Sequence, residues 1–77
     1  MSINIDYKKL AQYAQTRANI LLDASKELLK VKDEAWKEGD IHRWSVINFA
    51  ADWLHRDFEE ALKDRDEFLE KADYKGE

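Results

Sequence analysis

Apolar residues recur at alternating steps of three and four along two long stretches of the chain. The first stretch is broken only by Arg17 and carries Tyr7, Leu10, Ala14, Leu21, Ala24, Leu28, Val31 and Ala35. The second is broken only by Arg65 and carries Trp44, Ile47, Ala51, Leu54, Phe58, Ala61, Phe68 and Ala72. Alternating steps of three and four are typical of the buried stripe of a coiled-coil-like helix. The pattern therefore predicts two long amphipathic helices, each with one apolar seam.

The strongest break between the two stretches is Glu38-Gly39-Asp40, because the chain has no proline and only one other glycine, Gly76. A glycine suits the left-handed position that closes a helix, and an aspartate suits the N-cap of the next one. Asp6 or Asn4 can cap the first helix in the same way. We therefore place the helices at about 5–38 and 41–72, with ends uncertain by roughly two to four residues.

Seventy-seven residues allow a single domain, spanning 1–77. The short turn makes the two helices antiparallel, so the predicted fold is an all-α two-helix hairpin. Residues whose numbers add to about 79 should then face each other, which pairs Leu21 with Phe58, Leu28 with Ala51 and Ala35 with Trp44. The main structural alternative is a break near Asp23 or Ser25, which would give three shorter helices.

A second apolar stripe lies beside each seam. It contains Ala11, Ala18, Leu22, Leu29 and Trp36 in the first helix and Val46, Phe49, Ala50 and Trp53 in the second. A hairpin covers one stripe per helix, and an exposed apolar patch of this size usually marks an interface. We therefore expect the hairpin to associate into a four-helix-bundle dimer. The candidate interface lies mostly near the turn and comprises Leu22, Leu29, Trp36, His42, Trp44, Val46, Phe49 and Trp53.

The stripe of the second helix changes from aromatic to acidic along its length. After Val46, Phe49 and Trp53, the same spacing continues with an acidic strip, Asp57, Glu60, Asp64 and Glu67. One interpretation is a docking surface, in which an aromatic anchor and acidic side chains suit a partner with a basic groove. The other is a dimer core near the turn, followed by an ordinary solvated face.

Arg17 and Arg65 interrupt the two seams at a similar height in the antiparallel register. Together with Tyr13, one turn before Arg17, they are a possible pocket for a phosphate or a carboxylate. The alternative is that each arginine extends past the seam to one of the many nearby acids.

Catalytic and metal-binding patterns are weak in this chain. There is no cysteine, neither glycine belongs to a phosphate-binding loop, and no carboxylate pair is placed in an apolar setting. Asp52, His55 and Glu59 could face one metal ion, but a firm site needs more ligands, and these positions lie on the polar outer face. We therefore expect no enzymatic activity, no metal and no cofactor.

Charge and hydropathy suggest the compartment and the class of partner. No apolar run approaches ~20 residues, and the first residues lack the features of a signal peptide, so we expect a cytoplasmic protein with no membrane contact. The net charge is −4, and residues 57–77 alone carry nine acids against four bases. General binding to nucleic acid is therefore unfavourable, because phosphate contacts come from Lys and Arg.

These observations favour a non-enzymatic protein-interaction module that is dimeric or larger and binds a second protein with a basic surface. Its size and charge suit a small phage or mobile-element accessory protein that inhibits a host enzyme, for example a defence nuclease. The hairpin plan also resembles the Rop-type RNA-binding hairpins of plasmids, without shared motifs. That resemblance implies an RNA binder using Lys8, Lys9, Arg17, Lys26 and Lys30. A third alternative is a small anionic-ligand binder that uses the arginine pair.

Overall fold

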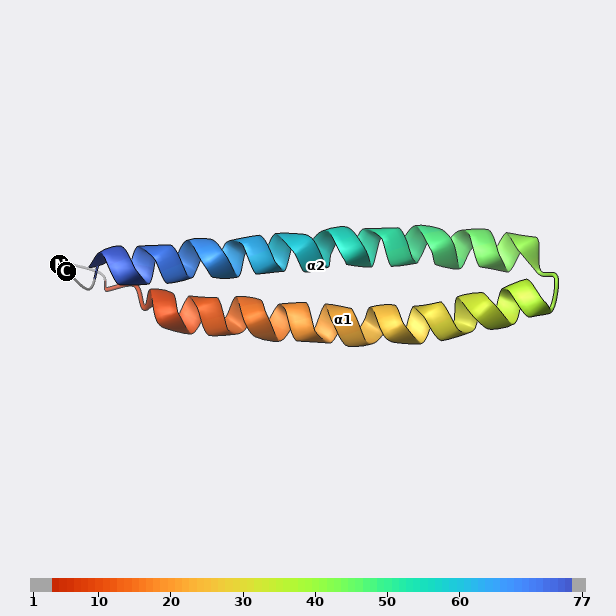
Figure 1. The fold of residues 1–77 in the computed structure, drawn as a ribbon, viewed down its shortest axis with the longest axis horizontal. Coiled ribbons are helices and arrows are strands. Elements are labelled where there is room, and N and C mark those ends of the chain that lie inside the picture. Colours follow the sequence, from red (N-terminus) through yellow and green to blue (C-terminus); the bar gives the residue numbers. More distant parts are fainter. Residues whose placement is uncertain (1–3, 76–77) are drawn as a thin grey trace.

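The chain folds into two long helices that lie side by side and antiparallel (Figure 1). The computed structural model describes residues 4–75, and the side chains of residues 4–73. Helix α1 spans Tyr7–Lys37 and α2 spans Ile41–Lys75, and no strand is present within 4–75. The hairpin measures 60 × 18 × 16 Å. The predicted all-helical hairpin is confirmed, and the three-helix alternative is excluded because α1 continues unbroken through Asp23 and Ser25.

Aspartate side chains cap both helices at their N-terminal ends. Asp6 accepts a hydrogen bond from the backbone N–H of Lys9 at 3.0 Å, and Asp40 accepts one from the backbone N–H of Arg43 at 3.0 Å. Each cap satisfies a backbone donor that has no partner within its helix. Of the two candidate caps for α1, the structure therefore uses Asp6.

Gly39 reverses the chain in the short turn between the helices. Its φ of 74° lies in the left-handed region, which costs a glycine little because it has no side chain. The Gly39 N–H donates to the carbonyl of Trp36 at 3.1 Å, and the Asp40 N–H donates to that of Ala35 at 2.9 Å. This pair of bonds is the Schellman motif that ends many helices. Turn and cap together place α2 directly beside α1.

Contacts between the helices confirm the predicted register to within a few residues. Four pairs link α1 to α2 along its length, namely Tyr7 with Phe68, Gln15 with Arg65, Arg17 with Asp64 and Trp36 with Trp44. The numbers in each pair add to a similar total. The seam therefore stays in phase over the whole hairpin.

Small side chains occupy the closest part of the interface. The buried residues among those described are Ala11, Ala14, Ala18, Ala35, Ile47 and Ala61, and no large side chain is fully buried. The prediction that placed Ala11 and Ala18 in the second stripe is wrong, since they are only 3% and 0% exposed. The register brings Ala18 level with Ala61, where two methyl groups allow the backbones to approach closely. Arg17, one residue earlier, lies at the edge of the seam and stays exposed.

We expect Ala61→Leu to lower the free energy of unfolding by ~1–3 kcal/mol, because extra methylene groups at a closed contact force the helices apart. Ala50→Leu is the matched control, since Ala50 is an exposed alanine of the same helix. It should change stability by less than ~0.5 kcal/mol. Urea unfolding followed by far-UV circular dichroism, at one protein concentration, compares the two. A larger loss for Ala50→Leu would contradict the observed packing.

We expect Gly39→Ala to destabilise the hairpin by ~1–2 kcal/mol, because an L-residue is strained at this φ. Steric contact does not contribute, since a Cβ at this position meets no atom within 4 Å. Gly39→Asn should cost less than Gly39→Ala, because asparagine adopts the left-handed region more readily. Thermal unfolding of the three proteins measures both differences, and equal losses would show that backbone strain is not the cause.

Candidate interaction surfaces

Large apolar side chains remain in contact with solvent over much of the hairpin. Within residues 4–73, eleven are exposed by 41% to 72%: Ile5, Tyr13, Ile20, Leu22, Leu29, Trp36, Ile41, Val46, Phe49, Trp53 and Leu69. Two helices have a single interface, which cannot cover apolar residues on several sides of each helix. The hairpin therefore leaves large apolar side chains uncovered on more than one side.

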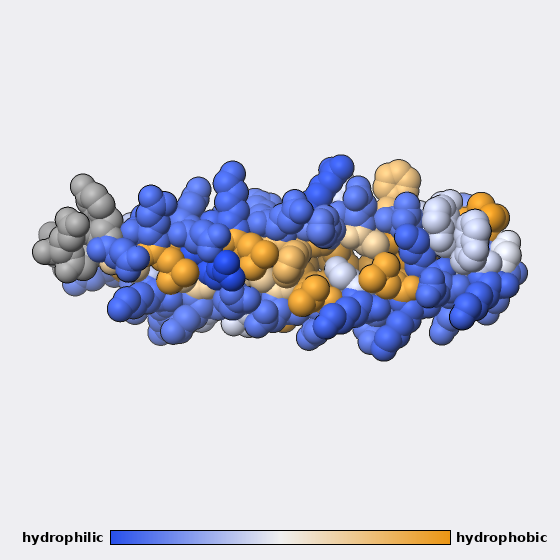
Figure 2. Space-filling model, in the orientation of Figure 1, coloured by the Kyte–Doolittle hydropathy of each residue, from blue (hydrophilic) through white to orange (hydrophobic). Residues whose placement is uncertain are grey.

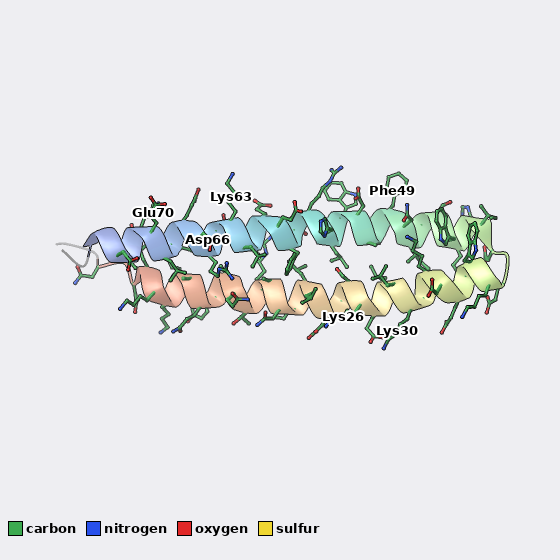
Figure 3. All side chains as sticks on the ribbon, viewed as in Figure 1. Lys26, Lys30, Phe49, Lys63, Asp66 and Glu70 are labelled. Atoms are coloured by element: carbon green, nitrogen blue, oxygen red, sulfur yellow. The ribbon has the colours of Figure 1, made fainter. Side chains whose placement is uncertain are left out.

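The predicted interface residues do not form one surface. Leu22, Leu29 and Trp36 recur every seven residues, so they share one side of α1, and the Trp36 ring lies 5.5 Å from that of Trp44 across the hairpin. Phe49 points away from α1 instead, on the outer side of α2 (Figure 3). Val46 and Trp53, three residues before it and four after it, share that outer side. The candidate interface therefore divides into two separate surfaces.

The first surface follows the groove between the helices. A hollow of about 320 Å³ crosses both of them and is lined by Lys8, Ala11, Gln12, Gln15, Arg65 and Leu69. Figure 2 shows apolar side chains gathered along the groove, with hydrophilic side chains on both borders. Residues seven apart lie on the same side of a helix, so the sides of α1 and α2 that carry Lys8 and Leu69 can be followed along both helices. We call this surface the grooved face. It comprises Lys8, Gln15, Leu22, Leu29 and Trp36 of α1, and Ile41, Asn48, His55, Leu62 and Leu69 of α2.

The grooved face carries very little charge. Its ten positions include one lysine and no acidic residue. The acids along its α2 border each have a partner in their own helix, in the pairs Asp52 with Arg56 (3.5 Å), Glu59 with His55 (2.9 Å) and Asp66 with Arg65 (2.9 Å). An apolar centre with a polar border is the usual composition of a protein–protein interface.

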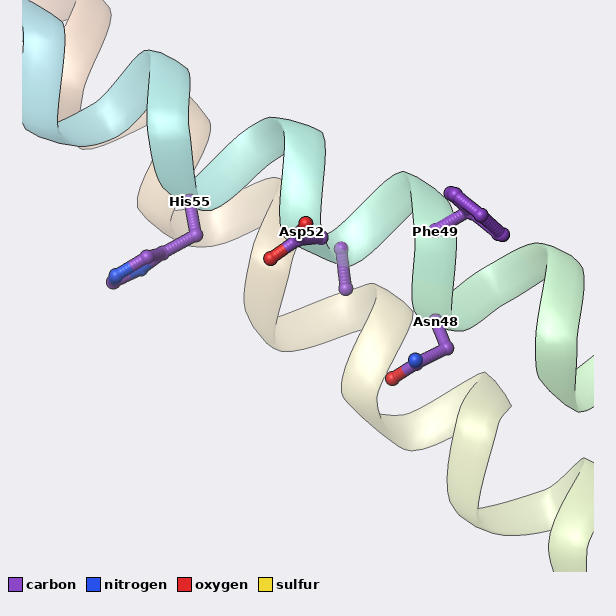
Figure 4. A pocket seen from close by; sticks show the side chains of 5 residues that line it. Asn48, Phe49, Asp52 and His55 are labelled. Carbon is purple, nitrogen blue, oxygen red and sulfur yellow. The ribbon is translucent and has the colours of Figure 1, made fainter.

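A second hollow lies on α2 alone. Its lining residues are Asn48, Phe49, Ala51, Asp52 and His55, all from consecutive turns of this helix (Figure 4). Because no other element closes over it, the hollow is an open depression on the surface. It lies between the two surfaces, since Asn48 and His55 belong to the grooved face and Phe49 belongs to the outer side of α2.

The acidic strip has few compensating cations. Glu60 and Glu67 are exposed, whereas Asp57 and Asp64 are half-buried beside the seam. Asp64 lies 4.0 Å from Arg17, and no other member of the strip has a basic side chain within 4.0 Å in the described part of the chain. The strip therefore contrasts with the paired acids that border the grooved face.

The two arginines contact different partners on different sides of the hairpin. Arg17 lies near Asp64, and Arg65 donates to the side chains of Gln15 at 2.6 Å and Asp66 at 2.9 Å. Gln15 and Arg17 are two residues apart in α1, which separates their directions by ~200° around the helix. An anion shared by the two guanidinium groups would have to compete with both aspartates. Tyr13 is exposed one turn before Arg17.

The turn-proximal end contains the remaining predicted residues. Trp44 is half-buried, with the Trp36 ring on one side and the Lys32 ammonium 5.3 Å from its ring centroid. His42 is exposed in the first turn of α2. The cation–π contact and the ring pair hold Trp44 at the end of the seam, so that Trp36 covers it on the grooved side.

Some exposed apolar residues were not predicted from the sequence. Ile20 is 64% exposed on α1, and Ile41 and Leu69 are exposed on the grooved face of α2, where Leu62 is half-buried. The spacing of seven from Leu62 to Leu69 was a usable signal, because it repeats the spacing of Leu22 and Leu29. Ile20 has no comparable signal, since its nearest repeat is the amphipathic Tyr13.

Two further searches concern metals and membranes. No group of three or more His, Asp or Glu side chains within the described residues is arranged to hold a metal ion. Neither helix has, over those same residues, a stretch that is both long and apolar enough to cross a bilayer. Asp52 lies 3.5 Å from Arg56, and the His55 Nε2 atom lies 2.9 Å from Glu59.

Comparison of the chain with protein-family models, curated proteins and solved structures found no significant match. A function therefore has to be inferred from the surfaces of the hairpin. These surfaces are the grooved face, and the outer side of α2 with its acidic strip.

We expect Arg65→Ala to destabilise the hairpin by about 1 kcal/mol, because it removes a part-buried hydrogen bond between the helices. Arg17→Ala should cost less than about 0.5 kcal/mol, since its ion pair is long and solvent-exposed. Urea unfolding of both variants at one protein concentration gives the comparison. A greater loss for Arg17→Ala would show that the exposed pair is the stronger link.

Proposed function

We propose that this chain is a non-enzymatic protein-interaction module that binds a partner with a basic surface through the outer side of α2. The observation that carries the proposal is the junction of exposed aromatic residues with an acidic strip in which, within the described residues, only Asp64 lies within 4.0 Å of a basic side chain. Phe49 and Trp53 are 72% and 62% exposed, and the acidic strip begins one turn beyond Trp53. The two features share one side of one rigid helix.

The aromatic end supplies affinity. Phe and Trp side chains bury a large apolar area, and aromatic residues are enriched among the few positions that dominate binding energy. Both side chains lie on a continuous helix, so the backbone that carries them is already ordered before binding. The Arg56 guanidinium lies 5.8 Å from the Trp53 ring centroid.

The acidic end steers the approach of a basic partner and discriminates against acidic ones. Unpaired carboxylates create a negative potential that accelerates encounter with a positively charged surface and repels an acidic one. Glu60 and Glu67 are the exposed members of the strip. A row of carboxylates on a helix suits a groove that otherwise binds nucleic acid. The partner class we propose is therefore a host nucleic-acid enzyme, such as a defence nuclease, which a small phage or mobile-element protein would inhibit.

Self-association into a four-helix bundle is part of the proposal. The exposed apolar residues outside the aromatic end exceed what one hairpin covers, and helical domains of this size often gain stability as oligomers. Light scattering at micromolar concentration should give at least twice the 9.1 kDa chain mass. A folded monomer would contradict this part of the proposal and leave the binding of a second protein untouched.

The partner is identified by affinity capture from host lysate treated with nuclease, followed by surface-plasmon kinetics of the captured protein. We expect Glu60→Lys with Glu67→Lys to slow its association at least tenfold at low salt, because steering acts on the association rate. The difference should shrink at high salt, where exposed charges are screened. The matched control is Asp23→Lys with Glu27→Lys, the same change in net charge at exposed positions on α1 that lie outside the grooved face.

Equal kinetics for the two double variants would show that the strip is only a solvated surface. The RNA-binding alternative predicts the opposite sign, since added lysines should tighten binding to a short hairpin RNA. On that alternative the basic residues of α1 make the contacts, although Lys30 already lies 3.3 Å from Glu27. Binding of the RNA by the wild-type hairpin, strengthened by the reversal, would overturn the proposal.

A further inference from the structure

We infer that the grooved face is the surface that a second copy of this chain covers, while the outer side of α2 remains free for another protein. The inference rests on the proposed self-association and specifies which face of the hairpin forms the dimer interface. The structure separates residues that the periodicity grouped as one interface. Leu22, Leu29 and Trp36 belong to the grooved face, and Phe49 and Trp53 do not.

The exposed area of the hairpin is larger than a chain of this mass usually keeps. Its accessible surface is 6296 Å². A compact monomeric protein of the same mass exposes about 4,900 Å², and one with the mass of two chains exposes about 8,100 Å². Two hairpins that form one compact bundle would therefore bury about 4,500 Å² in total, which is in the range of permanent homodimer interfaces.

Both helices repeat apolar residues at the spacing that bundle cores use. Leu22, Leu29 and Trp36 follow one another by seven in α1, and Leu62 and Leu69 do so in α2. A seven-residue repeat keeps a stripe on one side of a supercoiled helix. Six of the ten positions of the grooved face are apolar, and Lys8, Gln15, Asn48 and His55 are its polar positions. The grooved face is therefore the second stripe of each helix that a four-helix bundle would bury.

Charge decides between the two surfaces for self-association. In a two-fold dimer residue i of one copy contacts residue j of the other and j contacts i, so a patch has to complement itself. The grooved face, at its ten positions, has no acid and one lysine, Lys8, at its end. The outer side of α2 carries the four acids of the strip and one lysine among them, Lys63, so it offers few cations to the acids of a second copy (Figure 3). Like charges in contact across an interface are unfavourable, so this side suits a partner of opposite charge.

The hollow on the grooved face supports the same assignment. It lies at the small side chain of Ala11 and is bordered by Gln15, Arg65 and Leu69. In a single hairpin this space is open to solvent, and apolar side chains from a second copy would fill it. The Arg65 and Gln15 side chains already bond to each other at 2.6 Å, so their polar groups keep a partner inside a dimer.

The absence of cysteine from the chain allows a direct test with single-thiol variants. Leu29→Cys reports on the grooved face and Phe49→Cys on the outer side of α2. At a concentration where sedimentation gives a dimer, alkylation of Leu29→Cys by a maleimide should be at least tenfold slower than that of Phe49→Cys. Each rate is normalised to the rate in concentrated urea. In the single hairpin the two side chains are 52% and 72% exposed, which explains less than a twofold difference.

A pair of charged variants gives a second readout. Leu22→Glu with Leu29→Glu should raise the dimer dissociation constant at least 100-fold in sedimentation equilibrium. Ile20→Glu with Phe49→Glu makes the same chemical change at residues outside the grooved face and should leave the constant within threefold. If the first double variant fails to fold, the alkylation rates still decide.

The outcomes separate this inference from the proposed function. A wild-type dimer in which Leu29→Cys reacts as fast as Phe49→Cys would overturn the assignment of the face and leave self-association standing. A folded wild-type monomer would overturn both. If Ile20→Glu with Phe49→Glu dissociates the dimer, the dimer interface lies outside the grooved face. The outer side of α2 would then not be free to bind a basic partner.

Discussion

The close contact between α1 and α2 at alanine residues is the constraint on which the hairpin depends. Two helices have one interface, and only side chains as small as those of Ala18 and Ala61 are completely enclosed in it. Larger seam residues such as Leu28 and Phe58 are half-buried, because no third element covers their outer edges. The alanines let the helices approach closely, so the larger neighbours pack against each other from both sides. The apolar area buried by this contact offsets the entropy of ordering two long helices.

The same constraint explains why the surface is informative. A single interface leaves every apolar residue outside the seam in contact with solvent, so the hairpin exposes Leu29, Trp36 and Phe49 together. These residues differ in their surroundings. Near the groove, the acids of α2 are paired with basic side chains of their own helix, as in Asp52 with Arg56. On the outer side, Glu60 has no basic side chain within 4.0 Å among residues 4–73. Charge compensation therefore distinguishes two surfaces that have similar apolar content.

The two surfaces suit different partners, a second copy of this chain and another protein. A charge-poor groove with a heptad repeat suits a copy of the same chain, because identical surfaces tolerate contact only where charge is low or balanced. An aromatic end joined to unpaired acids suits a different protein with a basic surface. Both can operate together, since Leu29 belongs to the grooved face and Phe49 points away from α1 on the outer side of α2 (Figure 3). A dimer would then present two binding surfaces, one on each α2.

The sequence by itself determined the two helices, the turn at Gly39, the cap at Asp40 and the antiparallel register. These features depend on local chemistry and on periodicity, which a single chain displays. Only the tertiary structure decided the rotation of α1. Leu10 and Ala11 are adjacent and both apolar, as are Leu21 and Leu22, so the pattern permits phases that differ by ~100°. In the structure α1 is rotated so that the small side chains of Ala11 and Ala18 are buried, which lets the two backbones approach closely. With α1 rotated in this way, Leu22, Leu29 and Trp36 do not share a surface with the aromatic end of α2. Whether side chains of two helices share a surface depends on the rotation of each helix about its own axis, and the sequence leaves that rotation open.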